Sequence, residues 1–137
     1  MQSKEKIRDI IVQRSRDEQN GKVCENFTHH YEMTNPLCGD HVKVFLYLRE
    51  SDVFDLSYQS AGCTLCMASS SFMKEEISFL ERNHALEKIQ LFEKHLSLHE
   101  DREWPEDIFF FHYFAHLKKN PTRQMCAFLP WATLRGA

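Results

Sequence analysis

Residues 41–59 read HVKVFLYLRESDVFDLSYQ, and this stretch decides the fold that the sequence predicts. Apolar and polar side chains alternate from Val42 to Leu48, the period of two that is typical of a β-strand with one buried face. After a turn near Ser51-Asp52, a second alternation runs from Phe54 to Gln59, with Phe54, Leu56 and Tyr58 on one face. The two segments predict an antiparallel hairpin.

The faces of this hairpin limit its register. A two-residue loop at 51 and 52 would set Leu46 against Ser57 and so mix the apolar and polar faces, whereas a three-residue loop sets apolar against apolar residues. In either register Cys63, which follows the second strand, comes beside Cys38 and Asp40, which precede the first. The hairpin therefore predicts proximity of these three side chains, but not their geometry.

Helical periodicity marks the chain on both sides of the hairpin. Asn20-Gly21 is expected to end the first helix, and Asn120-Pro121 separates the last two. The predicted elements are a helix over residues 3 to about 19, an edge strand over 27–31, a helix from 64 to about 82, a periodic stretch over 86–96, a helix starting at Pro105, and a last helix from about Thr122. We expect one compact domain over residues 1–137.

Composition excludes several classes of protein. Four Gly, four Pro and 12% aromatic residues exclude the disordered and the collagen-like classes. A net charge of −3 argues against nucleic acid as a partner, because neutralising phosphates needs a surplus of Lys and Arg. The chain has no apolar run near the roughly 20 residues of a membrane span, and its N-terminus lacks the apolar core of a signal peptide. We expect a cytoplasmic protein without a membrane partner.

Five cysteines raise the question of metal binding or sulfur chemistry, because an odd number in a reducing compartment does not suggest disulfides. Cys63 precedes a predicted helix, whose N-terminus is expected to lower the pKa of the thiol. Cys126 lies on a separate helix, and spacing alone does not bring it to the hairpin. Each thiol taken alone fits a buried apolar side chain equally well, whereas three thiolates with Asp40 would form a tetrahedral zinc site.

Three segments resemble the motifs of a known family. They are NPLCGD over residues 35–40, AGCTLCMASSSFM over 61–73 and PTRQMCAFLPW over 121–131. In this order they resemble the NPxCGD, GxGCxIxxASxSxM and PxRxxCxxLxW motifs of the IscU/NifU-like iron–sulfur cluster assembly proteins. The resemblance implies an α+β fold, a small three-stranded antiparallel sheet covered by helices. It also implies an exposed metal site formed by Cys38, Asp40, Cys63 and Cys126.

Details of the motifs indicate the SufU branch of this family. The interval from Cys63 to Cys126 is long, Met125 stands where the scaffold branch usually has histidine, and no LPPVK sequence is present. Members of the SufU branch resemble zinc-dependent sulfurtransferases that accept persulfide sulfur from a cysteine desulfurase of the SufS type. By this resemblance, Cys38 leaves the zinc to accept the sulfur, and Arg123 steadies the freed ligand or the incoming group. The sulfur then passes to a downstream iron–sulfur scaffold.

Two other functions stay open at this stage. The same cysteines and Asp40 could hold a [2Fe–2S] cluster on a scaffold protein, in place of Zn²⁺ on a sulfur carrier. A zinc-stabilised structural domain without sulfur transfer is the third reading.

Other residues with metal-binding chemistry fit structural roles. Cys66 replaces the small residue common at its place in the motif and is interpreted as a buried helix thiol, although competition for the metal stays open. Cys24 lies outside the motifs. The pairs His95/His99 and His112/His116 have i,i+4 spacing, but Tyr113 stands where an HExxH motif has glutamate, so they are interpreted as solvent-facing.

Overall fold

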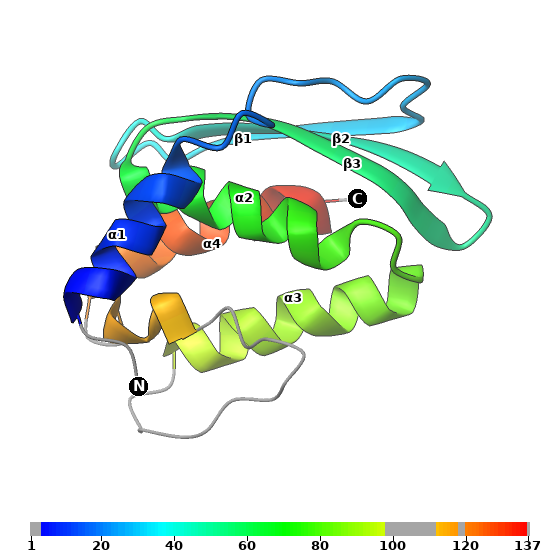
Figure 1. The fold of residues 1–137 in the computed structure, drawn as a ribbon. Coiled ribbons are helices and arrows are strands. Elements are labelled where there is room, and N and C mark those ends of the chain that lie inside the picture. The colour runs from blue at the N-terminus through cyan, green and yellow to red at the C-terminus, as the bar shows by residue number, and fades with distance from the viewer. Residues whose placement is uncertain (1–3, 98–111, 118–119, 137) are drawn as a thin grey trace.

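The computed structural model describes residues 4–97, 112–117 and 120–136. The elements follow the predicted order, with a three-stranded sheet between helical segments (Figure 1). They are α1 (Lys4–Ser15), β1 (His29–Thr34), β2 (His41–Arg49), β3 (Asp52–Ala61), α2 (Thr64–Ile77), α3 (Arg82–Ser97), the short 3₁₀ helix η2 (Ala115–Leu117) and α4 (Pro121–Arg135). The predicted α+β class is confirmed.

The sheet is an antiparallel meander in the order β1-β2-β3. Across β2 and β3, Val44 pairs with Tyr58 and Leu46 with Leu56, so the apolar faces coincide as the sequence predicts. These core-facing side chains are buried, which explains the alternation along both strands. Strand β1 pairs with β2 and forms an edge of the sheet, as predicted. It begins two residues later and ends three residues later than the predicted strand over 27–31.

The end of the hairpin differs from the prediction. Arg49 pairs with Asp52, which leaves a two-residue loop in which Glu50 has a φ of 57°. The register shifts between Tyr47 and Leu48, so β3 contains one extra residue at this point. Val53 is buried as a result, while Phe54, predicted on the core face, is exposed.

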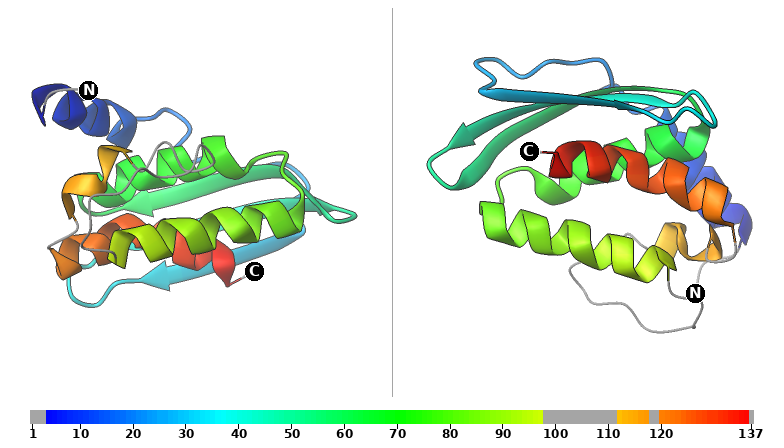
Figure 2. Two further views of the ribbon diagram at one scale, coloured as in Figure 1. Left: turned by 90° about the horizontal axis from the view of Figure 1, so that it is seen from below. Right: turned by 180° about the vertical axis from the view of Figure 1, so that it is seen from behind.

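The helices form two layers beneath one face of the sheet (Figures 1 and 2). Helix α2 packs on β3, and α4 packs beside α2 on β1 and β2. Helix α3 packs against α4 on the side away from the sheet, and α1 lies against α2. The core lies between these layers, with Trp131, Tyr58 and Phe92 among its largest fully buried side chains.

Small residues allow α2 and α4 to approach closely. Ser69 is fully buried, and its hydroxyl donates a hydrogen bond to the carbonyl oxygen of Ala127. The indole N–H of Trp131 donates to the same hydroxyl over 3.0 Å. These contacts fix α4 beside α2 and so determine where Cys126, the residue before Ala127, lies.

Helix α2 ends five residues earlier than predicted. Phe79 has a φ of 67°, which a right-handed helix does not contain. The backbone then pairs with the start of β3, since the N–H of Phe79 donates to Val53 O and the N–H of Val53 donates to Leu80 O. These bonds replace the helical ones, and α3 begins at Arg82.

The other helix boundaries differ less. Helix α1 ends at Ser15 rather than near residue 19. Helix α4 begins at Pro121, one residue before the predicted start, and proline is well tolerated in the first turn of a helix. The predicted helix starting at Pro105 lies mostly outside the described residues. None of the helices in the described part of the chain is long and apolar enough to span a membrane.

Candidate metal centre

The loop between β1 and β2 is organised by Asn35. Its backbone N–H donates to Asp40 O, and its carbonyl accepts the N–H of Gly39, both over 2.8 Å. Its side-chain oxygen accepts the N–H of Leu37 over 3.0 Å. The loop therefore turns tightly, with Leu37 (73% exposed) and Cys38 exposed at its tip and Asp40 directed into the protein at 1% exposure.

Asp40 connects this loop to the start of α2. Its Oδ1 accepts the backbone N–H of Cys63 over 2.8 Å, and its Oδ2 accepts the Cys63 thiol over 3.4 Å. Gly62 makes this approach sterically feasible, because a Cβ there would clash with Asp40 Oδ1 and lie 2.9 Å from Asp40 Cα. Gly62 also has a φ of 137°, which favours glycine.

Cys63 is the N-cap residue of α2. Its Sγ accepts the backbone N–H of Cys66 over 3.4 Å, the role that a hydroxyl or carboxylate oxygen usually takes at this position. The side chain of Cys63 is half-buried between Asp40 and the first turn of α2. The hairpin therefore brings Cys63 beside Asp40, as the sequence predicts.

Cys126 reaches the same place from α4. Its Sγ lies 3.6 Å from Cys38 Sγ, although the two residues are 88 positions apart in the chain. Donor atoms of Cys38, Asp40 and Cys126 all lie within 4.8 Å of one another. Cys63 is not one of this set of three, but it contacts Asp40 directly. We call the four residues Cys38, Asp40, Cys63 and Cys126 the thiol–carboxylate cluster.

Two donor distances within the cluster match those around a tetrahedral ion. Zn–S bonds of about 2.3 Å place two sulfur ligands about 3.8 Å apart, close to the 3.6 Å between Cys38 and Cys126. The 3.4 Å from Cys63 Sγ to Asp40 Oδ2 is likewise close to the separation of about 3.6 Å expected for a sulfur and an oxygen ligand. Three sulfur donors and one carboxylate suit zinc, and thiolate donors also suit iron–sulfur clusters.

Without a cation, burial and negative charge keep the inner thiols protonated. Burial raises the pKa of Cys63, and the charge of Asp40 adds to this rise, outweighing the lowering by the Cys66 N–H. The prediction that the helix N-terminus lowers the pKa of Cys63 is therefore wrong for the metal-free chain. Burial also raises the pKa of Cys126, and hydrogen bonds to Asp40 and Cys38 raise it further.

Asp40 shows the opposite behaviour. Burial by itself would raise its pKa, but the Cys63 N–H and the thiols of Cys38, Cys126 and Cys63 together lower it below the ordinary value. Asp40 therefore stays ionised and supplies a fixed negative charge beneath the exposed thiol of Cys38. A divalent cation at this place would reverse the thiol pKa shifts, because a coordinated thiol is deprotonated.

Arg123 lies one helical turn before Cys126 and is exposed. Its side chain lines a pocket with Thr64 and Leu65 from the start of α2 and with α1 residues that include Lys4 and Arg8. The structure thus brings Arg123 to the neighbourhood of the cluster. Sequence reasoning missed Asn35 and the steric role of Gly62, although both belong to the quoted motif segments.

The remaining metal-binding side chains lie elsewhere or make other contacts. Cys24 is buried, with its N–H bonded to Ser57 Oγ and its thiol 3.6 Å from Phe45 O. The His95 ring is half-buried, and its Nδ1 lies 2.9 Å from Leu91 O, so it is not simply solvent-facing. His99 and the side chain of His116 lie outside the described residues.

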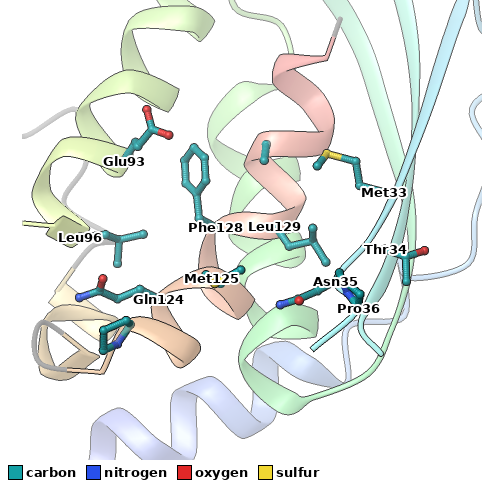
Figure 3. A pocket seen from close by; sticks show the side chains of 12 residues that line it. Met33, Thr34, Asn35, Pro36, Glu93, Leu96, Gln124, Met125, Phe128 and Leu129 are labelled. Carbon is teal, nitrogen blue, oxygen red and sulfur yellow. The ribbon is translucent and has the colours of Figure 1, made fainter. Parts of the chain in front are cut away.

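A mainly apolar groove of about 500 Å³ lies between the end of β1, α3 and α4 (Figure 3). Met33 and Pro36 contribute from the β1 side, Met125 and Phe128 from α4, and Leu96 from α3. Pro36 and Met125 are sequence neighbours of the cluster-bearing segments, so the groove begins beside the site.

The fold and the site define the class of this protein. The chain belongs to the NifU-like N terminal domain family, whose profile matches residues 6–103. The predicted IscU/NifU-like membership is confirmed, and the chain is an iron–sulfur cluster assembly protein of this type.

Individual relatives come from both branches of the family. The chain is 29% identical over 105 residues to the zinc-dependent sulfurtransferase SufU of Bacillus subtilis, covering 75% of this chain and 69% of that protein. It is 27% identical over 106 residues to the iron–sulfur cluster assembly scaffold protein IscU of Streptococcus pyogenes, covering 77% and 66% respectively.

Solved structures agree on the fold. The putative iron–sulfur cluster assembly scaffold protein for the SUF system from Fervidobacterium islandicum superposes with a TM-score of 0.84 at 25% identity, over 98% of both chains. A NifU-like protein from Brucella abortus gives a TM-score of 0.81 at 18% identity, covering 93% of this chain and 88% of that one, a likeness of fold alone.

Proposed function

We propose that this protein is a zinc-dependent sulfurtransferase, which accepts persulfide sulfur from a cysteine desulfurase and passes it on for iron–sulfur cluster assembly. The observation that carries the proposal is the position of Cys38. All five cysteines lie in the described part of the chain, and Cys38 alone is exposed, at the tip of a loop and 3.6 Å from the buried Cys126. The likeness to a sulfurtransferase of the SufU type supports the same function.

The proposed metal ligands are Cys38, Asp40, Cys63 and Cys126. Bound zinc would keep the cysteine ligands deprotonated and lower their nucleophilicity. Cys63 and Cys126 are held by α2 and α4, and Asp40 by its bonds to Asn35 and Cys63. Cys38 lies exposed in the same loop as Asp40, beside Gly39, which has a φ of 74°. Cys38 is therefore the ligand that can leave with the least disturbance of the fold.

The transfer step at Cys38 is an exchange of one S–S bond for another. The Cys38 thiolate attacks the terminal sulfur of the desulfurase persulfide and forms a new S–S bond with it. The bond between that sulfur and the desulfurase cysteine breaks, and the desulfurase cysteine leaves as a thiolate. The transferred sulfur keeps its oxidation state, so the step needs no oxidant or reductant.

Arg123 is proposed as a positioning residue. Its guanidinium carries a positive charge, and its place beside Thr64 and Leu65 suits an anionic group that approaches the cluster. Arg123→Ala is expected to lower stimulation of the desulfurase while the zinc content stays at one ion per chain. An unchanged stimulation would remove Arg123 from the mechanism, and Arg123→Lys tests whether charge alone is sufficient.

The decisive experiment combines metal analysis with desulfurase turnover. Protein purified without oxygen is expected to hold about one zinc ion per chain and to stimulate sulfide production by a SufS-type desulfurase several-fold. Cys38→Ala is expected to abolish the stimulation, while Cys24→Ala, a buried thiol outside the cluster, serves as the control.

The IscU relatives favour one second function, a scaffold for a [2Fe–2S] cluster on the same four residues. An iron chromophore in the purified protein, together with no stimulation of the desulfurase, would establish the scaffold and refute the sulfurtransferase. Zinc without stimulation would refute both and leave a structural zinc domain.

A further inference from the structure

A second pocket lies near the thiol–carboxylate cluster. It has a volume of about 460 Å³ and is formed by α1, the start of α2 and the first turn of α4. Figure 1 shows α1 beside the start of α2, at the same end of the sheet as the β1–β2 loop. The proposed function uses only Arg123 of this pocket and leaves its α1 side without a role.

The pocket has an apolar interior and a basic rim. Its apolar lining side chains are buried or half-buried, and they include Ile7, Ile11 and Leu65. Three exposed cationic side chains line it as well, those of Lys4, Arg8 and Arg123. None of the described residues that line it is acidic, although the whole chain has more acidic than basic residues, 20 against 17. We call this site the basic pocket.

The α1 side of the basic pocket follows from helical spacing. Lys4, Ile7, Arg8 and Ile11 stand at positions i, i+3, i+4 and i+7, so they share one face of the helix. This arrangement is unfavourable by itself, because like charges at i and i+4 repel and Lys4, the first residue of α1, opposes the helix dipole.

The three cations have no counter-charge of their own. Within the described part of the chain, Lys4, Arg8 and Arg123 make no ion pair. Three unpaired positive charges around an apolar interior are complementary to a group that is both negatively charged and partly apolar.

The basic pocket is close enough to the cluster to lie under the same partner. Arg123 precedes Cys126 by three residues in α4, a rise of about 4.5 Å along the helix, and Cys126 Sγ lies 3.6 Å from Cys38 Sγ. Thr64, which also lines the pocket, directly follows Cys63. A protein interface of standard size buries about 800 Å² on each side and so extends about 15 Å from its centre. An interface centred on Cys38 is therefore expected to include the basic pocket.

We propose that the basic pocket is a docking site for the cysteine desulfurase, which places there an acidic side chain flanked by apolar ones. The inference rests on the proposed function. The carboxylate would lie among Lys4, Arg8 and Arg123, and its apolar neighbours would cover the isoleucines of α1. A second copy of this chain is a poorer match, because a two-fold contact at this pocket would bring the same cations together.

The test measures the affinity of the zinc-loaded protein for a SufS-type desulfurase by calorimetry, separately from turnover. Lys4→Glu/Arg8→Glu is expected to weaken binding about tenfold or more, and Lys4→Gln/Arg8→Gln by a smaller factor without adding acidic groups to α1. The difference from wild type should shrink as NaCl rises from about 50 to about 500 mM, because salt screens exposed charges. Maximal stimulation at saturating concentration and zinc content should stay at the wild-type level.

The matched control is Arg16→Glu/Lys22→Glu. Both of its residues are exposed and lie outside the basic pocket, and the total charge changes by the same amount. This control should bind the desulfurase within about twofold of the wild type, since long-range attraction is largely screened.

Equal affinities of Lys4→Glu/Arg8→Glu and the control would overturn the proposal, because general attraction would then explain the charge effect. Unchanged desulfurase affinity with a changed sedimentation coefficient of the free protein would also overturn it and assign the pocket to a contact between copies. Failure of the proposed function looks different. In that case the wild type binds the desulfurase, and the α1 variants weaken this binding, but the enzyme is not stimulated.

Discussion

Gly62 and Asp40 show how a single position can control the geometry of the thiol–carboxylate cluster. Asp40 is almost completely buried and keeps its charge through the Cys63 N–H and the surrounding thiols. Its carboxylate occupies the space that a side chain at residue 62 would need. The absence of a Cβ at Gly62 is therefore a condition for the cluster as well as for the backbone turn.

Gly62→Ala is expected to destabilise the protein by about 2 to 4 kcal/mol, from the left-handed φ and the clash with Asp40 together. Zinc affinity should fall as well, because Asp40 has to move. Urea unfolding and chelator competition measure the two effects. Gly21→Ala is the matched control, since Gly21 has a φ of 99° but a Cβ at this residue would meet nothing within 4 Å, and it should lose only about 1 kcal/mol. Equal losses would show that the clash is relieved without cost.

Asp17 connects the segment after α1 to α2. Its Oδ2 accepts the hydroxyl of Ser71 over 2.7 Å, and its Oδ1 accepts the N–H of Gln19 over 3.0 Å. Burial alone would raise its pKa, but these hydrogen bonds and the charge of Arg14 lower it below the ordinary value. The ionised carboxylate therefore stabilises the folded state.

Because the folded pKa of Asp17 is lowered, its contribution is complete above the unfolded pKa and is lost as the pH falls through the folded value. Asp17→Asn is expected to reduce the free energy of unfolding by about 1 kcal/mol at pH 7, and the difference from wild type should shrink as the pH approaches 3. Urea titrations at several pH values measure this, with the exposed Glu18→Gln as the control. A difference that stays constant over this range would contradict the assigned role.

At the scale of elements, the contact between α2 and α4 decides the position of Cys126. Ser69 is the central residue, since its hydroxyl donates to Ala127 O and accepts the indole N–H of Trp131. The small side chains of Ser69 and Ala127 allow the axes of α2 and α4 to lie close together. This close packing determines the position of Cys126, the residue before Ala127. The sequence contains the small residues, but their meaning depends on which helix lies opposite.

Ser69→Ala is expected to lower the free energy of unfolding by about 1 to 3 kcal/mol, because it leaves the buried Trp131 N–H without its acceptor. Ser70→Ala provides the matched control in the same helix. Its hydroxyl bonds only the Cys66 carbonyl within α2, so about 0.5 kcal/mol or less should be lost. Equal losses in urea unfolding would show that the Trp131 bond does not contribute.

Particular elements show what the sequence can and cannot predict. The β2–β3 faces and the order of the helices follow from local periodicity, and so they agree with the structure. The end of α2 does not, because Phe79 and Leu80 exchange helical bonds for bonds to Val53, a residue 26 positions away from Phe79. The extra residue in β3 likewise depends on pairing with β2.

The same division applies to the candidate site. The hairpin argument predicts that Cys38, Asp40 and Cys63 lie together, and Asp40 contacts Cys63 as expected. Only the resemblance indicated that Cys126 joins them, because no spacing rule describes how α4 packs against α2. The sign of the Cys63 pKa shift was missed for a related reason, since burial and the neighbouring charge of Asp40 appear only in the folded chain.

At the scale of the whole molecule, the cluster connects three separate parts of the chain. Cys38 and Asp40 come from the β1–β2 loop, Cys63 from the start of α2, and Cys126 from α4. An ion bound by all four residues would link the end of the sheet to α2 and α4. Metal binding and folding are therefore expected to be coupled.

Zinc at a free concentration of about 100 times its dissociation constant is expected to raise the free energy of unfolding by about 2.7 kcal/mol. Urea unfolding under reducing conditions, with zinc or with a chelator, measures this increment. Cys126→Ser should lose most of the increment, and Cys24→Ala should keep it. An increment of the same size in Cys126→Ser would exclude α4 from the metal site.

The exposed loop tip has one further consequence. Leu37 stands beside Cys38 with nearly three quarters of its surface in water. A protein that covers this leucine on docking would also come close to the adjacent sulfur and could exclude solvent from it. Docking of the partner and protection of the sulfur would then begin together. A persulfide sulfur on Cys38 would be protected from small-molecule thiols for as long as the two proteins stay bound.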